Sequence, residues 1–177
     1  MNDKILEFTY RPIADKKKAF PLLFVLLGVS LSLVILSMQI NLYKGVISLL
    51  AMVGIIASTY IYVKYISSEY IYSVMINDND EAMFLINKVI GKRSSLMCSF
   101  YLCDVISVQK FTKETKKEYV ADPRANKYNF IVTFMKDDFY LVKTSSPLAK
   151  CEIKLECSDE VAKRILDYAA LSKTEEE

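Results

Sequence analysis

Two uncharged apolar segments near the N-terminus constrain this chain more than any other feature. Ala19–Ile40 and Gly45–Val63 contain no charged residue, and only the break Asn41-Leu42-Tyr43-Lys44 separates them. At about 1.5 Å rise per residue the first segment forms a helix of roughly 33 Å, enough for a hydrocarbon core of about 30 Å. A break this short makes the two helices antiparallel neighbours. The sequence therefore predicts a transmembrane helical hairpin over residues 19–66.

The placement of lysines predicts which side of the membrane holds the termini. Lys16, Lys17 and Lys18 precede the first apolar segment and Lys64 follows the second, whereas the connecting break carries only Lys44. Basic residues are enriched on the cytoplasmic side. We therefore expect a two-span protein of the cell membrane with both termini in the cytoplasm. The competing interpretation is a cleaved signal peptide, which fits poorly because the first segment is long and a second follows it directly.

Small residues indicate how the two helices touch. Gly28 and Ser32 are four apart in the first segment, while Ala51, Gly54 and Ser58 form one stripe in the second. Such spacing lets helix backbones approach closely in lipid. We expect this contact within the hairpin, and a dimer interface is the alternative. The absence of a charged side chain in mid-span argues against an ion or proton pathway, and so against a transporter.

The remaining residues divide into a leader, one domain and a tail. Residues 1–18 form a basic juxtamembrane leader, residues 67–172 a cytoplasmic domain of ordinary single-domain size, and residues 173–177 an acidic tail. The leader carries five Lys/Arg against three Asp/Glu, whereas residues 67–177 carry sixteen against eighteen. A mildly acidic domain lacks the electrostatic basis for nucleic-acid binding, so no nucleic-acid partner is expected. Three arrangements are open for the leader: it lies along the inner leaflet, packs on the domain or stays loosely ordered.

The domain sequence alternates between strand-like runs and turn signals. Seven runs have β-type composition: Glu69–Ile76, Ala82–Ile90, Ser94–Tyr101, Asp104–Phe111, Tyr128–Met135, Phe139–Thr144 and Lys150–Cys157. Polar turns at 77–80, 91–93 and 136–138 predict hairpins between the runs that flank them. The polar segment Thr112–Lys127 predicts the longest surface loop of the domain.

The last run leads into a predicted helix. Charged side chains alternate with Cys151, Ile153, Leu155 and Cys157, so we expect these four to face the core and the charges to face outward. Ser158 is a good N-cap, and acids follow it in the first turn. An apolar stripe near the helical period then continues to about Leu171; its members are Val161, Ile165, Leu166, Tyr168 and Ala169.

This order of elements resembles a group of small membrane proteins. The runs EYIYSVMI, AMFLINKVIGKR, SSLMCSFYLCDVISV, YNFIVTF and CEIKLECSDEVAKRIL look like uncharacterised bacterial proteins that join a two-helix transmembrane hairpin to a cytoplasmic pleckstrin-homology-like (PH-like) domain. The resemblance covers Lys16 to about Leu171. It implies an α+β membrane protein whose seven-stranded antiparallel PH-like barrel is capped by the C-terminal helix. Eukaryotic relatives often bind phosphoinositides through a basic first strand–strand loop, but Asn77–Glu81 is acidic here, so that property is not implied.

The reactive side chains argue against an enzyme. The chain has no histidine, which removes the commonest general base and metal ligand. Its four glycines form no phosphate-binding loop, and no serine has the spacing of a nucleophile elbow. The pairs Cys98/Cys103 and Cys151/Cys157 are spaced more loosely than zinc-binding pairs and lie in apolar runs. We therefore expect no catalytic residue, no metal, no cofactor and, in a reducing cytoplasm, no disulfide.

Exposed basic residues are the remaining candidates for a functional site. We predict a non-enzymatic, membrane-anchored module, a protein-binding adaptor or assembly component at the inner face of a bacterial membrane, with a protein partner or homo-oligomer. Candidate partner-binding residues are Lys92, Arg93, Lys113, Lys116, Lys117 and Arg124. The alternative function is a lipid-sensing module, in which anionic headgroups of the bilayer contact Lys16, Lys17, Lys18 and Lys64. The alternative for both groups of residues is that they are ordinary solvated surface charges without a binding role.

Overall fold

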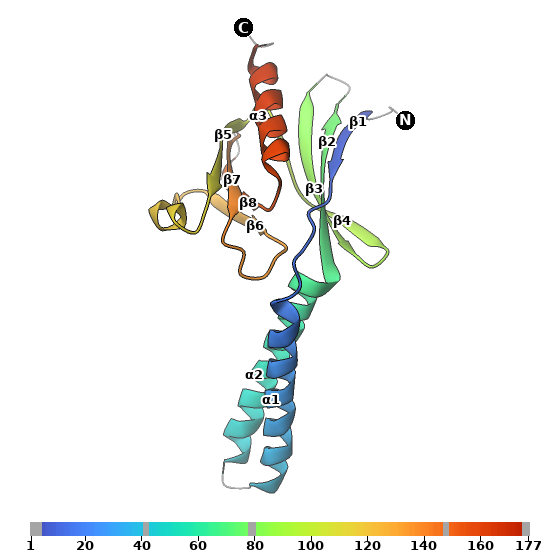
Figure 1. The fold of residues 1–177 in the computed structure, drawn as a ribbon, viewed down its shortest axis with the longest axis vertical. Helices are drawn as coiled ribbons and strands as arrows, with labels where there is room; N and C mark the ends of the chain where they lie inside the picture. Colours follow the sequence, from blue (N-terminus) through green and yellow to red (C-terminus); the bar gives the residue numbers. More distant parts are fainter. Residues whose placement is uncertain (1–4, 41–42, 78–80, 147–148, 175–177) are drawn as a thin grey trace. The chain divides into compact units, whose positions relative to one another are not determined.

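A computed structural model describes residues 5–40, 43–77, 81–146 and 149–174 (Figure 1). The chain divides into two compact units. Ala14–Ser68 is the helical unit, and Met1–Ile13 together with Glu69–Glu177 is the strand unit.

The helical unit is an antiparallel pair of helices. Helix α1 spans Ala19–Gln39 and helix α2 spans Lys44–Ile61, which continues as the π-helical segment η1 (Tyr62–Ser67) (Figure 1). Both helices are long and apolar enough to cross a membrane. Lys16 Nζ donates a hydrogen bond of 2.8 Å to the carbonyl of Ile66, which ties the start of the unit to its end. The predicted pair of adjacent apolar helices is confirmed.

The contact between α1 and α2 uses the predicted face of α2 but a different face of α1. Ala51 and Ser58 are buried, and a Cβ built on Gly54 would lie 2.2 Å from Ser30 Oγ of α1. The predicted α1 residues Gly28 and Ser32 are instead exposed. On α1 the buried row is Leu23, Ser30 and Ser37. These residues are seven apart, and a seven-residue repeat stays on one face over two helical turns.

The strand unit contains eight described strands in two sheets rather than a closed barrel. The first sheet has the order β1-β2-β3-β4 and comprises β1 (Ile5–Tyr10), β2 (Ser68–Ile76), β3 (Ala82–Ile90) and β4 (Arg93–Tyr101). The second has the order β5-β7-β8-β6 and comprises β5 (Val105–Phe111), β6 (Asn126–Phe130), β7 (Phe139–Ser145) and β8 (Lys150–Leu155). The expected single seven-stranded antiparallel barrel is therefore wrong.

Part of the N-terminal leader is a strand of the first sheet. Strand β1 pairs antiparallel with β2, where Tyr10 lies opposite Tyr72 and their rings stack 6.1 Å apart. Arg11 forms an ion pair of 3.5 Å with Glu69. Of the three alternatives for the leader, packing on the domain is the one observed. Because β1 is short and far from β2 in sequence, its pairing is not visible in local patterning.

The predicted hairpin between Tyr128–Met135 and Phe139–Thr144 is wrong. Strand β6 ends at Phe130 and pairs in parallel with β8, while β7 lies between β5 and β8. The N–H groups of Val132 and Thr133 donate to the Glu156 carboxylate, at 3.1 and 2.8 Å, instead of to a strand. The composition of residues 131–135 is typical of a strand, and it does not reveal that the Glu156 carboxylate accepts the backbone hydrogen bonds that a neighbouring strand would otherwise accept.

The two sheets pack through aromatic side chains. Tyr72 Oη donates a 3.0 Å hydrogen bond to the carbonyl of Phe130, and the rings of Tyr70 and Phe130 meet edge to face at 5.5 Å. The largest fully buried side chains are Tyr72, Phe84, Ile86, Leu102, Leu141, Ile153, Leu155 and Ile165. This core is made by both sheets and the C-terminal helix.

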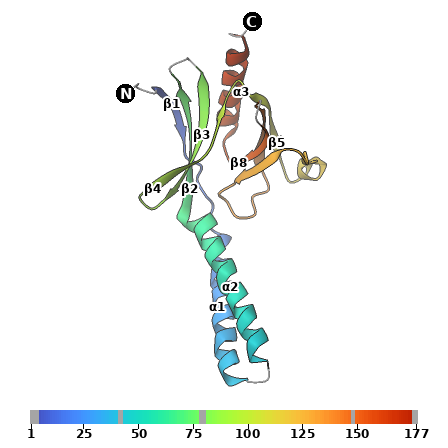
Figure 2. The same ribbon diagram turned by 180° about the vertical axis from the view of Figure 1, so that it is seen from behind.

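Helix α3 (Asp159–Thr174) lies alongside both sheets (Figures 1 and 2). The backbone N–H of Val161 donates to Ser158 Oγ at 3.4 Å, which confirms the predicted N-cap. The helix buries Val161, Ala162, Ile165 and Ala169. Leu166, assigned to the apolar stripe, is exposed.

Candidate functional site

A buried carboxylate on β8 fixes the long loop between β5 and β6. Glu152 is only 3% exposed. It accepts hydrogen bonds from Tyr119 Oη at 2.5 Å and from the backbone N–H of Asp122 at 3.3 Å, and pairs with Lys143 at 3.5 Å. Burial alone raises the pKa of Glu152, but the bonds from Tyr119 and Asp122 and the charge of Lys143 outweigh it, so the pKa is lowered. Glu152 is thus a charged clamp.

The contacts of Glu152 with Tyr119 and Asp122, called the clamp below, hold the loop that carries the exposed basic residues. The ring of Tyr119 meets that of Phe111 edge to face at 5.5 Å, and Lys154 Nζ lies 4.7 Å from the centre of the Tyr119 ring. A short 3₁₀ segment, η2 (Thr115–Glu118), precedes Tyr119. The side chains of Lys113, Lys117 and Arg124 are exposed, while that of Lys116 lies outside the described residues. The predicted surface loop is therefore confirmed as exposed, but it is held at several points.

A second buried carboxylate has a structural role. Glu156 is 7% exposed, accepts the N–H groups of Val132 and Thr133 and the Thr133 hydroxyl (2.7 Å), and pairs with Lys136 at 3.2 Å. The predicted outward direction of the β8 charges is thus wrong for Glu152 and Glu156. Strand β8 has neighbours on both sides, and the flanking loops cover both carboxylates.

A polar pocket of about 180 Å³ lies beside the start of α3. Lys110 Nζ lies 2.7 Å from Asp159 Oδ1, and Tyr140 Oη donates to the same oxygen. These hydrogen bonds, from Lys110 first, lower the pKa of Asp159. Burial, followed by the nearby carboxylates of Asp159 and Glu156, raises the pKa of Cys157 to about 12. The thiol in this pocket therefore stays protonated at neutral pH and is a poor nucleophile.

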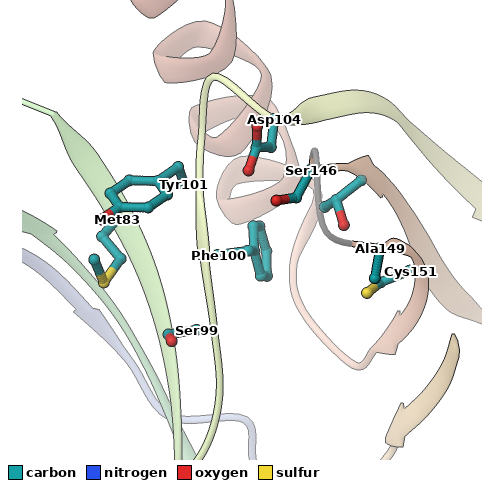
Figure 3. A pocket seen from close by; sticks show the side chains of 9 residues that line it. Met83, Ser99, Phe100, Tyr101, Asp104, Ser146, Ala149 and Cys151 are labelled. Atoms are coloured by element: carbon teal, nitrogen blue, oxygen red, sulfur yellow. The ribbon is translucent and has the colours of Figure 1, made fainter.

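A second hollow, of about 200 Å³, lies between the two sheets (Figure 3). Figure 3 shows Met83 and Tyr101 on the side of the first sheet, with Ala149 and Cys151 across from them. The remaining labelled side chains are those of Ser99, Phe100, Asp104 and Ser146. Its lining is mostly apolar and contains one carboxylate and no basic residue. This chemistry suits packing better than binding of a charged ligand.

The other predicted basic pair lies at the tip of the β3–β4 hairpin. Gly91 and Lys92 form a two-residue turn between paired Ile90 and Arg93, and Gly91 has φ +59°, as the first position of such a turn requires. Lys92 and Arg93 are exposed. They lie at the tip of a hairpin of the first sheet, whereas Lys113, Lys117 and Arg124 lie in the loop that connects β5 and β6 of the second sheet. The predicted basic residues therefore belong to two separate elements of the strand unit.

The lysines predicted to contact lipid gather at one end of the helical unit. Lys16 donates to Ile66, as described above, and Lys64 Nζ lies 3.2 Å from Tyr60 Oη and 5.2 Å from the centre of the Tyr65 ring. Lys17 and Lys18 are exposed.

Metal chemistry and known relatives add no further candidate. Within the described ranges, no three Cys, Asp or Glu side chains are grouped so that they could hold a metal ion. Cys98, Cys103, Cys151 and Cys157 are free thiols. Neither a family model, nor a curated protein, nor a solved structure matches the chain. The likeness to PH-like membrane proteins stays a prediction, and the function has to be argued from the surfaces described here.

Proposed function

We propose that this chain is a non-enzymatic binding module, anchored in a bacterial cell membrane by α1 and α2, whose strand unit binds another protein at the cytoplasmic face. Two observations support this proposal. The first is the apolar outer surface of the helices, and the second is the loop held by Glu152.

The outer surface of the helical unit suits lipid rather than water. Exposed fractions reach 66% for Phe24, 59% for Ile35, 63% for Leu49 and 58% for Ile56, whereas Ser30, Ser37 and Ser58 are buried between the helices. Soluble monomers rarely expose continuous apolar surface on this scale. The exposed Lys17 and Lys18 at one end favour that end as the cytoplasmic one.

The clamped loop is the surface best suited to a protein partner, and its geometry is the observation that carries the proposal. Lys113, Lys117 and Arg124 are exposed on a segment whose backbone is fixed through Tyr119 and Glu152. A pre-ordered loop loses less conformational entropy on binding than a free one. Its positive charge complements an acidic protein surface.

The first test measures capture of a partner in cells. A photocrosslinking amino acid replaces Val120, which is 83% exposed beside the clamp. Changing Lys113, Lys117 and Arg124 together to Glu is expected to lower the yield of the protein adduct at least about tenfold, because like charges meeting across an interface cost several kcal/mol. The matched control is Lys163→Glu on the exposed side of α3, which should leave the yield unchanged. An unchanged yield in the triple variant removes the loop as a binding surface.

A second variant separates charge from loop order. Glu152→Gln keeps every exposed lysine but weakens the clamp from Tyr119. We expect a smaller loss of adduct than in the triple variant, since the charges remain while the loop must be ordered on binding. Adducts between copies of the chain alone would instead assign the module to homo-oligomer assembly.

Lipid sensing is a second candidate function. It is favoured by the exposed Lys17 and Lys18 next to α1. Tight association with neutral vesicles that does not change when anionic lipid is added would exclude it.

A further inference from the structure

The β3–β4 hairpin differs in charge from the domain as a whole. Residues 82–101 carry Lys88, Lys92 and Arg93 and no acidic residue, whereas residues 67–177 as a whole carry sixteen Lys/Arg and eighteen Asp/Glu. The hairpin is therefore a positively charged element on a mildly acidic domain. Its composition favours an anionic surface as its neighbour.

The tip of this hairpin also exposes large apolar side chains. Exposed fractions are 41% for Ile90, 57% for Leu96 and 47% for Met97. Leu96 and Met97 lie within five residues of the turn, and strand β4 is the edge of its sheet. Exposed apolar side chains next to basic ones are typical of protein segments that lie in the headgroup region of a bilayer.

The connections place this tip at the end of the sheet from which the chain leads into the helices. Strands β2 and β3 are hydrogen-bonded neighbours, each nine residues long, and their connection is closed by a 2.9 Å hydrogen bond from Asn77 N–H to Glu81 carbonyl. So short a connection requires antiparallel strands, because parallel strands need a crossover. The end of β3 therefore returns to the level at which β2 begins. Strand β2 begins directly after η1, with no linker.

We propose that the tip of the β3–β4 hairpin, residues 90–97, inserts Leu96 and Met97 into the headgroup region of the bilayer, while Lys92 and Arg93 contact anionic phospholipid headgroups. This inference rests on the proposed membrane anchoring. Each basic residue near an anionic surface strengthens association roughly fivefold. Because the tip is tethered to the bilayer by α1 and α2, it meets lipid at a high effective concentration.

The edge of β4 is poorly suited to a strand-adding protein partner. Ile86 pairs with Cys98 and Asn87 with Leu96, so Met97 is an extra residue that forms a bulge in β4. Bulges and basic side chains are features that discourage further strand pairing at a sheet edge. A lipid surface needs no unbroken row of backbone partners, so the bulge does not oppose it.

The test uses tryptophan fluorescence, because the full chain contains no tryptophan. Single variants Leu96→Trp, Val120→Trp and Leu49→Trp are reconstituted in vesicles of zwitterionic lipid with or without phosphatidylglycerol, and quenched with lipids brominated along the acyl chain. Val120 is the matched control in the strand unit because its side chain is 83% exposed. Leu49 reports on anchoring because it lies on the exposed face of α2 and is 63% exposed.

We expect strong quenching at Leu49→Trp, clear quenching with a blue-shifted emission at Leu96→Trp, and neither at Val120→Trp. Adding Lys92→Glu and Arg93→Glu to Leu96→Trp should lower the equilibrium constant for tip insertion in anionic vesicles at least about twenty-five-fold, because each lost basic residue removes a factor of about five. The control pair Lys150→Glu and Lys163→Glu, at exposed positions outside the hairpin and the β5–β6 loop, should leave this constant unchanged.

Each other outcome overturns the inference for a different reason. Quenching at Leu49→Trp without quenching at Leu96→Trp leaves the anchor intact and removes tip insertion. No quenching at Leu49→Trp removes the anchor and, with it, the inference. A blue shift at Leu96→Trp without bromolipid quenching assigns the tip to protein contact, including contact with a second copy.

Discussion

The helical unit and the strand unit distribute polar and apolar side chains in opposite ways: apolar side chains are mostly exposed in the first and mostly buried in the second. Between α1 and α2 the buried side chains include Ser30, Ser37 and Ser58, while leucine, isoleucine, valine and phenylalanine face outward. In the strand unit the fully buried side chains are large and apolar, such as Tyr72 and Phe84. Burial of apolar area stabilises a fold in water, whereas helices in lipid associate through close packing and small residues. This difference supports the proposal that lipid surrounds the helical unit, whereas water surrounds the strand unit.

The hairpin tip is one of several places where the strand unit exposes large apolar side chains; Ile106, Val120, Met135 and Leu171 are others. Leu96 and Met97 are exposed to the same extent as many outward residues of α2. At the tip these side chains lie beside Lys92 and Arg93 in a hairpin without acidic residues, and this combination is the basis for proposing that the tip meets the lipid surface.

The largest expected effect comes from opening the apolar core of the strand unit. Phe84 is 0% exposed, so Phe84→Ala should lower the free energy of unfolding by about 4 kcal/mol. The matched variant Phe24→Ala, at a position that is 66% exposed on α1, should change it by less than about 1 kcal/mol. Urea unfolding of the reconstituted chain measures both. Equal losses of unfolding free energy would contradict the claim that apolar side chains stabilise the strand unit by burial and face outward in the helical unit.

A charge on the outer helix surface should have the next largest effect. Leu49→Lys is expected to raise the apparent free energy of membrane insertion of α2 by about 3 kcal/mol, since hydrocarbon does not solvate an ammonium group. Val120→Lys, at an exposed position of the strand unit, should alter stability by less than about 0.5 kcal/mol. A glycosylation-mapping insertion assay measures the first and thermal unfolding the second. Tolerance of Leu49→Lys would remove lipid as the solvent of that face.

Close packing between the helices is tested by two glycines. Gly54→Leu places a side chain where even a Cβ meets Ser30 Oγ, and should destabilise the hairpin by about 2 kcal/mol. Gly28→Leu is the control, because nothing lies within 4 Å of the position of its Cβ. Steric-trap or detergent-titration unfolding measures the difference. The same loss at both positions would show that α1 and α2 meet through another face.

The smallest effect concerns the clamp of the β5–β6 loop. Tyr119→Phe removes a hydrogen bond to Glu152 and should cost about 1 kcal/mol at pH 7. Because the folded-state pKa of Glu152 is lowered, the stabilisation is present above its ordinary pKa of about 4.3 and is lost as the pH falls through the folded-state value. The difference between wild type and Tyr119→Phe should therefore shrink in acid. Tyr128→Phe is the matched control, and a gap that does not change with pH would show that Glu152 is not the partner that matters.

Local patterning in the sequence determined the elements. The uncharged segments predicted α1 and α2, alternation and turn residues predicted most of the strands, and Gly91 predicted the tight turn of the β3–β4 hairpin. Ser158 likewise predicted the start of α3. These features depend on residues close together in the chain, so spacing and residue type are enough to predict them.

Which elements pair and which polar groups are buried depends on the tertiary structure. The pairing of β1 with β2 and the parallel pairing of β6 with β8 join segments that are distant in sequence, and local pattern carries no information about such partners. Glu152 and Glu156 alternate with apolar residues, as solvent-facing charges would. Their burial depends on hydrogen bonds from distant segments, at Tyr119 and Thr133, which lower the cost of removing a carboxylate from water.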